Sequence, residues 1–251
     1  MKYVRYEKDG NTHFGVLENG KIAELSGDYV LGAERTGVVT EEQDVKLLAP
    51  YIPGKIVGVG ANYKSFLDAK KREYPVRPRI FQKPKTSVLN MGEAICLPDA
   101  SHEVHYEGEL AVVIGKTCTK VKKEDAWNYI FGYTVINDVT DETMFKEDVI
   151  WARGKGCDTF APLGPVVVTD EIDPEDAMIE TKLNGTVVQH MSTSDINFHI
   201  PELIEYISSY MTLEAGDIIA TGTPVGVGCL HPGDHIEISI EGIGVLANDV
   251  K

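Results

Sequence analysis

Three carboxylates lie at the ends of two apolar runs that are typical of strands. Glu107 and Glu109 precede the run 110–114, and Asp138 follows the run 133–136. Because side chains alternate along a strand, Glu107 and Glu109 point to one face, where two anions repel each other unless a cation lies between them. Carboxylate oxygens are hard ligands that suit Mg²⁺, with Mn²⁺ or Ca²⁺ as substitutes. The spacing therefore predicts a metal site at Glu107, Glu109 and Asp138, and a solvated strand edge is the alternative.

Two glycine-rich segments offer further polar groups. Lys155 lies between Gly154 and Gly156, where the backbone can bring its ammonium group close to a ligand. The segment 221–228, Thr-Gly-Thr-Pro-Val-Gly-Val-Gly, follows a strand-like run and offers the Thr223 hydroxyl and backbone N–H groups. Either segment alone is weak evidence, because a lysine between glycines is usually part of a turn.

Several common catalytic motifs are incomplete or absent. His102 and His105 are separated by three positions, whereas the histidines of a zinc-binding HExxH helix are separated by four. Residues 58–63 contain two glycines of a dinucleotide fingerprint but Tyr63 in place of the third, and residues 154–156 lack the spacing of a Walker loop. No Gly-x-Ser-x-Gly elbow occurs. Zinc peptidase, NAD, ATP and serine hydrolase chemistry are therefore disfavoured.

The composition argues against polyanionic partners. The chain has 251 residues with 24 basic and 39 acidic side chains, and its formal net charge is -15. Nucleic acid and anionic membrane surfaces are unfavourable partners for so acidic a protein. The sequence shows no secretory signal and no apolar run long enough for a membrane span, and its four cysteines form no CxxC pair. We therefore expect a cytoplasmic protein with reduced thiols.

The first part of the chain is predicted to be a small β-rich unit. The alternating stretches 3–6, 13–17 and 21–25 are separated by polar turns that contain Gly10 and Asn19-Gly20. Pro50, Pro53 and Gly54 then interrupt the chain. We place a domain boundary there, with residues 1–52 as the small N-terminal domain and residues 53–251 as the catalytic domain.

The remainder is predicted to be mostly strands. The two-residue period favours an irregular, β-rich α+β fold over a doubly wound sheet. Helices are expected at about 123–131 and 200–211, and residues 62–73 can form a short charged helix or a mobile flap. The strand-like runs are 56–60, 94–97, 110–114, 133–136, 166–168, 186–188, 218–220, 235–240 and 245–247.

Together, the motifs resemble those of the fumarylacetoacetate hydrolase (FAH) superfamily. They are Glu-x-Glu at 107–109, Gly-Tyr-x-x-x-x-Asp at 132–138, Lys-Gly-x-Asp-Thr-Phe-Ala-Pro-Leu-Gly-Pro at 155–165, and Thr-Gly-Thr-Pro-x-Gly-Val-Gly at 221–228. They occur in the family's order, and the resemblance runs from about residue 55 to the end of the sequence. It implies a mixed β-roll catalytic domain, a homodimer, and a small-molecule substrate among the 2-oxo and β-diketo acids.

The resemblance also implies roles for individual residues. Mg²⁺ would be held by Glu107, Glu109 and Asp138, Lys155 would add a positive charge beside the substrate's keto oxygen, and Thr223 would hold its carboxylate. A 2-oxo carboxylate can chelate Mg²⁺, which then stabilises the developing enolate. Further substrate contacts are implied at Asn62, Tyr63, Lys83, Asp158 and Gly222.

The flap departs from the pattern of hydrolytic members. Those members carry Gly-Arg-Asn-Tyr-x-x-His with a glutamate three residues later, and the His–Glu pair activates water as a general base. Here the arginine is replaced by Ala61, the histidine by Phe66 and the glutamate by Ala69. Residues 139–145 also lack the Arg-Asp pair that members often have. The nearby side chains that could replace the missing base are Asp68, Glu73 and His105.

These departures favour isomerisation or decarboxylation over hydrolysis. We expect a Mg²⁺-dependent enzyme similar to 2-hydroxyhepta-2,4-diene-1,7-dioate isomerase, acting in aromatic catabolism on an unsaturated or 2-oxo dicarboxylic acid through a metal-stabilised enolate. One alternative is a C–C bond hydrolase of fumarylacetoacetate or acylpyruvate type. A second is a non-catalytic, metal-dependent binder of 2-oxo acids.

Overall fold

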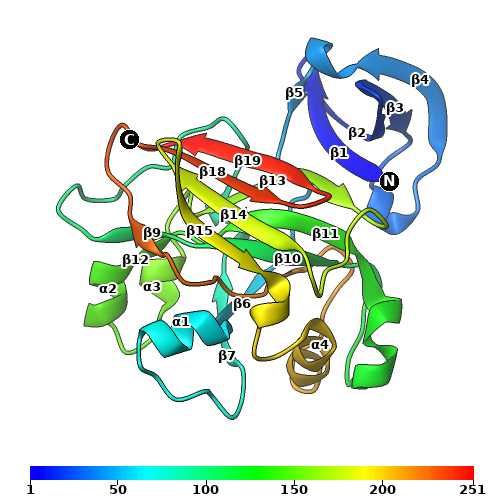
Figure 1. The fold of residues 1–251 in the computed structure, drawn as a ribbon. Helices are drawn as coiled ribbons and strands as arrows, with labels where there is room; N and C mark the ends of the chain where they lie inside the picture. The colour runs from blue at the N-terminus through cyan, green and yellow to red at the C-terminus, as the bar shows by residue number, and fades with distance from the viewer.

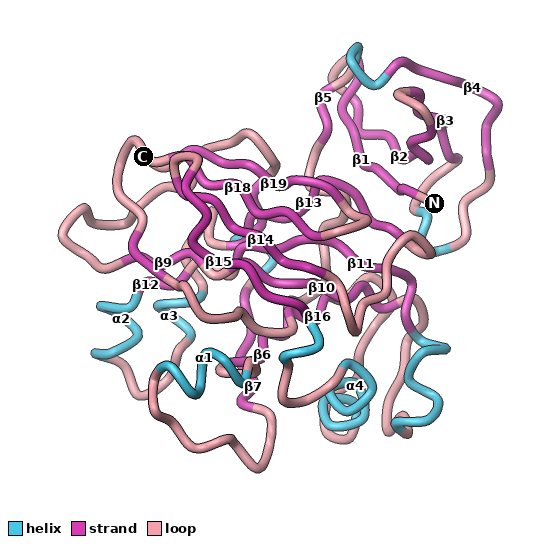
Figure 2. The backbone as a smooth tube through the Cα atoms, viewed as in Figure 1, coloured by secondary structure: helices cyan, strands magenta, loops and turns pink.

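Strands dominate the protein, as the two-residue period predicts (Figures 1 and 2). The computed structural model describes all residues, 1–251. Its largest sheet follows the order β4-β3-β2-β1-β13-β11-β10-β16-β6-β7, with β5 paired to β1 and β8 paired to β13. Most neighbours are antiparallel, whereas β16–β6 and β13–β8 are parallel, so the sheet is mixed. The β-rich α+β fold class expected from the sequence is confirmed.

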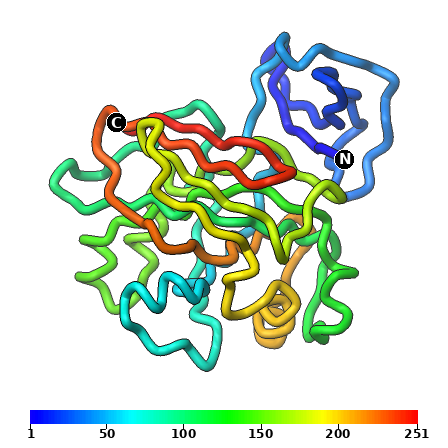
Figure 3. Tube along the Cα trace, in the orientation of Figure 1, coloured from blue at the N-terminus to red at the C-terminus, as the bar shows by residue number.

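The N-terminal strands form the predicted β-rich unit as an antiparallel meander, drawn in blue in Figures 1 and 3. Asp9-Gly10 and Asn19-Gly20 connect them, with all four residues at positive φ, the backbone of a type I′ hairpin turn. In addition, Lys2 pairs with Val168, which joins this unit to the main sheet. The domain boundary after residue 52 stays a prediction. The strands here are β1 Lys2–Lys8, β2 Asn11–Glu18, β3 Lys21–Leu25, β4 Arg35–Glu41 and β5 Lys46–Leu47.

The centre of the main sheet is buried on both faces. Every residue of β10 is buried, and its side chains alternate between two cores: Leu110 and Val112 belong to one, Ala111 and Val113 to the other. The remaining strands of this sheet are β6 Ile56–Gly60, β7 Arg79–Lys83, β8 Val88–Leu89, β10 Gly108–Ile114, β11 Ile130–Asn137, β13 Ala161–Val168 and β16 Ile218–Ala220.

Two smaller sheets complete the fold. The core that contains Leu110 and Val112, the first core, lies beneath a four-stranded sheet that crosses β10 and β11 in Figure 1. The core that contains Ala111 and Val113, the second core, is covered by Tyr29 and Tyr51 of the N-terminal segment. The four-stranded sheet, in the order β15-β14-β18-β19, consists of β14 Met178–Leu183, β15 Thr186–Ser192, β18 His235–Ile240 and β19 Gly244–Asp249. The three-stranded sheet consists of β9 Val104–Tyr106, β12 Thr140–Asp141 and β17 Gly228–Cys229.

The helices are few and short. They are α1 Lys64–Ala69, α2 Glu142–Glu147, α3 Ala152–Lys155 and α4 Ile200–Ser208, with short 3₁₀ helices at Tyr29–Leu31, Glu42–Asp44, Lys85–Ser87, Lys123–Tyr129 and Thr193–Asp195. The predicted helix at 200–211 is confirmed as α4, and α1 forms the helical part of the 62–73 flap. None of these helices is long and apolar enough to cross a membrane.

Two predicted elements differ in the structure. The helix expected at about 123–131 is present as a 3₁₀ helix that ends at Tyr129, because Ile130 pairs with Ile114 and begins β11. Residues 94–97 were expected to form a strand, but only Ile95 forms a β-bridge, to Val250 at the end of the chain. In both segments, tertiary pairing rather than local pattern decides the structure.

Candidate metal centre

The structure brings the three predicted carboxylates together. Glu107 precedes β10, Glu109 lies on it, and Asp138 follows the neighbouring strand β11. The antiparallel register places Gly108 opposite Asn137, and the Asp138 backbone N–H donates to the Glu107 carbonyl at 2.9 Å. One ligand atom from each carboxylate lies within 4.8 Å of the others. This arrangement could hold a divalent metal ion.

Two buried lysines partly neutralise this cluster. Lys155, at the end of α3, donates to Glu107 at 2.8 Å and to Asp138 at 2.6 Å, and Lys83 on β7 donates to Asp138 at 2.7 Å. Burial alone would raise the pKa of Asp138, but the two ammonium groups outweigh burial and hold that pKa below its usual range. Burial likewise favours neutral Lys155, yet the surrounding carboxylates raise its pKa. Asp138 is therefore an anion with two cationic partners.

Glu109 has no such partner, and this supports a metal ion as the missing cation. Its side chain is 2% exposed and accepts one hydrogen bond, from the Gly222 backbone N–H at 2.8 Å. Burial, followed by the charges of Asp138 and Glu107, raises its pKa well above the usual value. Since two lysines face three carboxylates, one negative charge is in excess. The donor set therefore fits a hard divalent ion.

The loop 221–228 holds the cluster from one side. Gly222 has a φ of +102°, and a Cβ there would lie 2.8 Å from the Asn62 Cβ, so glycine alone fits this position. Asn62 is buried and donates to the Thr221 carbonyl at 2.8 Å and to the Phe198 carbonyl at 3.1 Å. The Thr223 hydroxyl donates to the Gly108 carbonyl at 3.0 Å and accepts from Gln189 at 2.9 Å.

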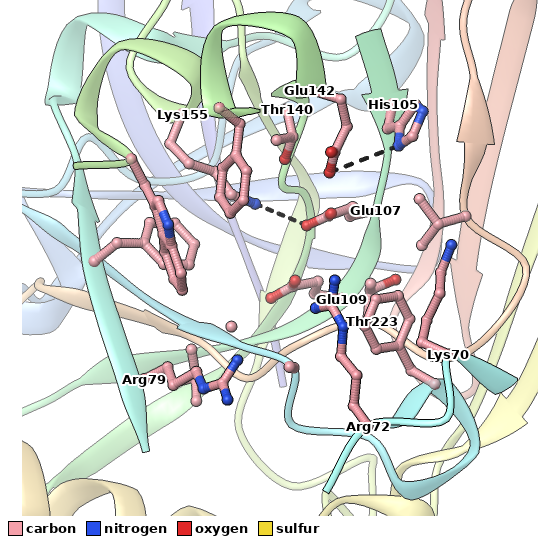
Figure 4. Close-up of a pocket in the computed structure, with 18 of the residues that line it drawn as sticks. Lys70, Arg72, Arg79, His105, Glu107, Glu109, Thr140, Glu142, Lys155 and Thr223 are labelled. Atoms are coloured by element: carbon pink, nitrogen blue, oxygen red, sulfur yellow. Dashed lines mark hydrogen bonds and ion pairs between the residues drawn. The ribbon is translucent and has the colours of Figure 1, made fainter. Parts of the chain in front are cut away.

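A cavity of about 480 Å³ opens above the cluster (Figure 4). Glu107, Glu109, Lys155 and Thr223 line it. The other residues implied as substrate contacts do not line the cavity. Asp158 is exposed outside it, and the remaining residues that do not line it are Asn62, Tyr63, Lys83 and Gly222. Charged and aromatic residues that sequence reasoning did not assign to the site also line it, namely Lys70, Arg72, Arg79, Glu142, Lys146, Phe81, Phe145 and Trp151.

One face of β7 supplies part of this wall. Arg79, Phe81 and Lys83 occupy alternate positions of the strand, so they share a face. The Lys155 ammonium lies 4.6 Å from the centre of the Phe81 ring, and a Cβ at residue 58 would overlap that ring, so Gly58 makes room for it. Residues 79–83 read Arg-Ile-Phe-Gln-Lys, which has no alternation of apolar and polar residues, so this strand has little signal in the sequence.

The replacement bases considered for the flap lie in different places. His105, on β9, lines the cavity, and its Nδ1 is 3.9 Å from a carboxylate oxygen of Glu142 at the start of α2 (Figure 4). Asp68 and Glu73 do not line it. Burial lowers the pKa of His105. The cavity thus contains a histidine–carboxylate pair, on elements other than the flap.

Comparison with known proteins gives similarity along nearly the whole chain. The fumarylacetoacetate (FAA) hydrolase C-terminal family matches residues 55–251, and the Rv2993c-like N-terminal family matches residues 1–50. The oxaloacetate tautomerase YisK of Bacillus subtilis is 43% identical over 221 residues, which cover 82% of this chain and 73% of that protein.

Solved structures agree with this similarity. The 2-hydroxyhepta-2,4-diene-1,7-dioate isomerase from Mycobacterium marinum has a TM-score of 0.92 and 40% identity, covering 100% of this chain and 98% of that chain. Maleylpyruvate hydrolase from Sphingobium sp. SYK-6, in complex with manganese (II) ion and pyruvate, has a TM-score of 0.83 and 30% identity with the same coverage.

Proposed function

Because the chain belongs to the fumarylacetoacetate hydrolase superfamily, we propose that it is a Mg²⁺-dependent isomerase or decarboxylase of an unsaturated or 2-oxo dicarboxylic acid. The observation that carries this proposal is the buried cluster of Glu107, Glu109 and Asp138 with Lys155 beside it. Its charge and oxygen donors suit Mg²⁺, with Mn²⁺ or Ca²⁺ as substitutes. The relatives named as a tautomerase and an isomerase support the same reaction class.

The residues of the chain have separate tasks in this proposal. A Mg²⁺ ion at the three carboxylates would act as a Lewis acid and stabilise negative charge on a chelated 2-oxo acid. Lys155 keeps a positive charge at the floor of the cavity, beside the position of the keto oxygen. Thr223 binds the substrate carboxylate by turning its hydroxyl from the Gly108 carbonyl toward the ligand. Phe66 lines the cavity where hydrolytic members carry a histidine, so the usual water-activating group is missing.

C–C bond hydrolysis is the second candidate. The similarity to maleylpyruvate hydrolase favours it, and so does the presence of His105 and Glu142 in the cavity. Both candidates use the same carboxylates and Lys155, so they differ in the fate of the substrate carbon chain.

Turnover of a substrate panel tests the proposal. We would incubate the protein with Mg²⁺ and oxaloacetate, acylpyruvates or a hydroxymuconate-type diacid, and follow the products by NMR. We expect enol–keto conversion, double-bond migration or release of CO₂ from at least one compound, and its loss in Glu109→Gln. Cleavage into two acids would select the hydrolase. Oxalate binding without turnover of any compound would leave only the non-catalytic binder.

A further inference from the structure

The cavity is rich in positive charge although the protein is acidic. Its lining contains five cationic side chains, Lys70, Arg72, Arg79, Lys146 and Lys155, and three carboxylates, Glu107, Glu109 and Glu142. The whole chain has the opposite balance, with 24 basic and 39 acidic residues. A site with this excess of cations attracts anions more strongly than the surrounding surface does.

Three of these cations form no ion pair within the protein. One of them, Lys70, has its ammonium 6.0 Å from the centre of the Phe66 ring, and the other two are arginines. Lys155 pairs with Glu107 and Asp138, and Lys146 pairs with Glu103 at 2.7 Å. Arg72 and Arg79 form neither an ion pair nor a side-chain hydrogen bond, and both are exposed at the cavity. In the view of Figure 4 they lie on the side of Glu109 opposite Lys155. Their guanidinium groups are therefore free to bind a ligand.

The face of β7 sets the spacing between the two charged ends of the cavity. Lys83 binds Asp138 at the floor, whereas Arg79 begins the strand four residues earlier, about 13 Å away at the usual rise per residue. Phe81 lies between them, and its ring packs edge-on against Trp151 with centroids 5.9 Å apart. The wall thus presents Arg79 at one end and the Phe81 ring in the middle, and Lys83 is buried behind the wall at the end near the carboxylate cluster.

We propose that Arg72 and Arg79 bind a second carboxylate of the substrate, at the end away from the metal-chelating 2-oxo acid group. This assignment rests on the proposed function. Lys83, Lys155 and a divalent ion together exceed the three carboxylates by one positive charge, which balances one substrate carboxylate. A distal carboxylate needs another cation, and arginine is suited to bind it through two parallel hydrogen bonds. The Phe81 ring then packs against the carbon chain of the substrate. The protein thereby selects dicarboxylic over monocarboxylic 2-oxo acids.

Binding of matched acids to the Mg²⁺-loaded protein tests this assignment. The probes are 2-oxoglutarate, 2-oxoadipate and 2-oxopimelate, each compared by calorimetry with the monoacid of equal length, in which a methyl group replaces the distal carboxylate. Oxalate reports on the metal-chelating end alone. At least one diacid is expected to bind about 10-fold to 100-fold more tightly than its monoacid, as for a charge-assisted hydrogen-bonded pair. Arg79→Gln and Arg72→Gln should each remove most of the preference for the diacid over the monoacid. Both variants should keep an oxalate affinity within about 2-fold of that of the native protein.

Arg77→Gln is the matched control, because Arg77 is exposed in the same segment and does not line the cavity. It should keep the diacid preference. The assignment is overturned if no diacid exceeds its monoacid, or if Arg77→Gln loses as much as the other two variants. If oxalate still binds only with Mg²⁺ in those cases, the metal centre stands and the arginine assignment alone fails. If oxalate shows no Mg²⁺-dependent binding, the proposed function itself fails.

Discussion

Glu109 is the residue on which the proposed metal centre depends most. It is buried and lacks a cationic partner, whereas Asp138 has two lysines. A buried carboxylate without a partner destabilises the folded state when it is ionised, because it has lost its hydration. In the metal-free protein, burial of Glu109 therefore lowers the free energy of unfolding, and binding of a divalent ion would restore it.

We predict that Glu109→Gln stabilises the metal-free protein by about 1–2 kcal/mol, since it replaces a buried carboxyl group that is costly to ionise with a neutral amide of the same shape. The same substitution should abolish stabilisation by Mg²⁺, which for the native sequence reaches about 2.7 kcal/mol at 100 times the dissociation constant. Urea unfolding with and without Mg²⁺ measures both effects. His102→Ala should retain the Mg²⁺ response. If His102→Ala loses that response and Glu109→Gln keeps it, the metal is bound by histidine and our assignment is wrong.

The flap offers a second test at single residues. From the resemblance to hydrolytic members, Phe66 and Ala69 are expected at the positions of the histidine and glutamate that activate water. Restoring both, by Phe66→His with Ala69→Glu, should raise C–C hydrolysis of an acylpyruvate by about 10²-fold or more, as for a general base. Phe66→His alone is the control, because it lacks the orienting carboxylate. No gain in the double variant would show that the missing pair does not limit hydrolysis.

Among the elements, β7 positions the cavity wall through its contact with β6. Gly58 pairs with Phe81, and the ring occupies the space that a side chain at residue 58 would need. We predict that Gly58→Ala displaces Phe81, destabilises the protein by about 1–3 kcal/mol and weakens substrate binding. Thermal unfolding and oxalate titration would measure this. Gly27→Ala is the control, because that glycine has open space around it and is not at positive φ. Unchanged unfolding and binding in Gly58→Ala would contradict this description of β7.

The start of α2 contains a pH-sensitive contact outside the cavity. Asp141 caps this helix by accepting from the Met144 N–H at 2.8 Å, and its other oxygen lies 2.6 Å from Nδ1 of His102. The hydrogen bond to Asp141 raises the pKa of His102. Stability from this pair is therefore fully present below the unfolded-state pKa of about 6.5 and is lost as the pH rises through the folded-state value.

We accordingly predict that unfolding by urea becomes easier for the native sequence as the pH is raised from about 6 to about 9, and that His102→Gln shows a smaller loss over this range. His231→Gln is the comparison, because His231 is exposed and lies 3.6 Å from Asp234. Equal pH dependence in the native protein and His102→Gln would contradict the role of this pair.

The elements differ in how far the sequence predicts them. Strands such as 56–60 and 235–240 carry an apolar pattern and were found as predicted, and so were the two positive-φ hairpin turns. The carboxylate cluster was predictable because strand alternation fixes where Glu107 and Glu109 point. By contrast, β7 begins with an arginine after two prolines and was missed, so the position of Arg79 in the cavity could not be foreseen. The contact of His105 with Glu142 depends on β9 and α2 meeting in space, and no local pattern encodes that.

For the whole molecule, the N-terminal unit covers the second core. Tyr29 stacks on Phe131 of β11 with ring centroids 5.4 Å apart, and Tyr3 contacts the same ring at 5.1 Å. We predict that residues 51–251 expressed alone bind a hydrophobic dye and aggregate, since removal of the unit exposes this core. Light scattering and dye fluorescence compare the fragment with the full chain. A monodisperse fragment with an unchanged unfolding midpoint would contradict this.

The expected homodimer is a second prediction at this scale. Val149 is 100% exposed and Ile150 is 76% exposed, and they precede α3, which carries Lys155. Light scattering during size-exclusion chromatography should give a mass twice 27.6 kDa. A monomer mass at concentrations of about 10 μM would show that the active unit is a single chain.

The residues at the floor of the cavity make many contacts within the protein, whereas the arginines at its rim make few, and this difference determines how the substrate range can change. The carboxylates and lysines at the floor are buried and joined to one another and to the backbone, so replacing one disturbs several others. Arg72 and Arg79 at the rim contact no other charged group, so they can be exchanged at almost no cost to folding. Directed evolution confined to positions 72 and 79 would then change the length and charge of the acids that bind, while the carboxylate cluster and Lys155 stayed intact.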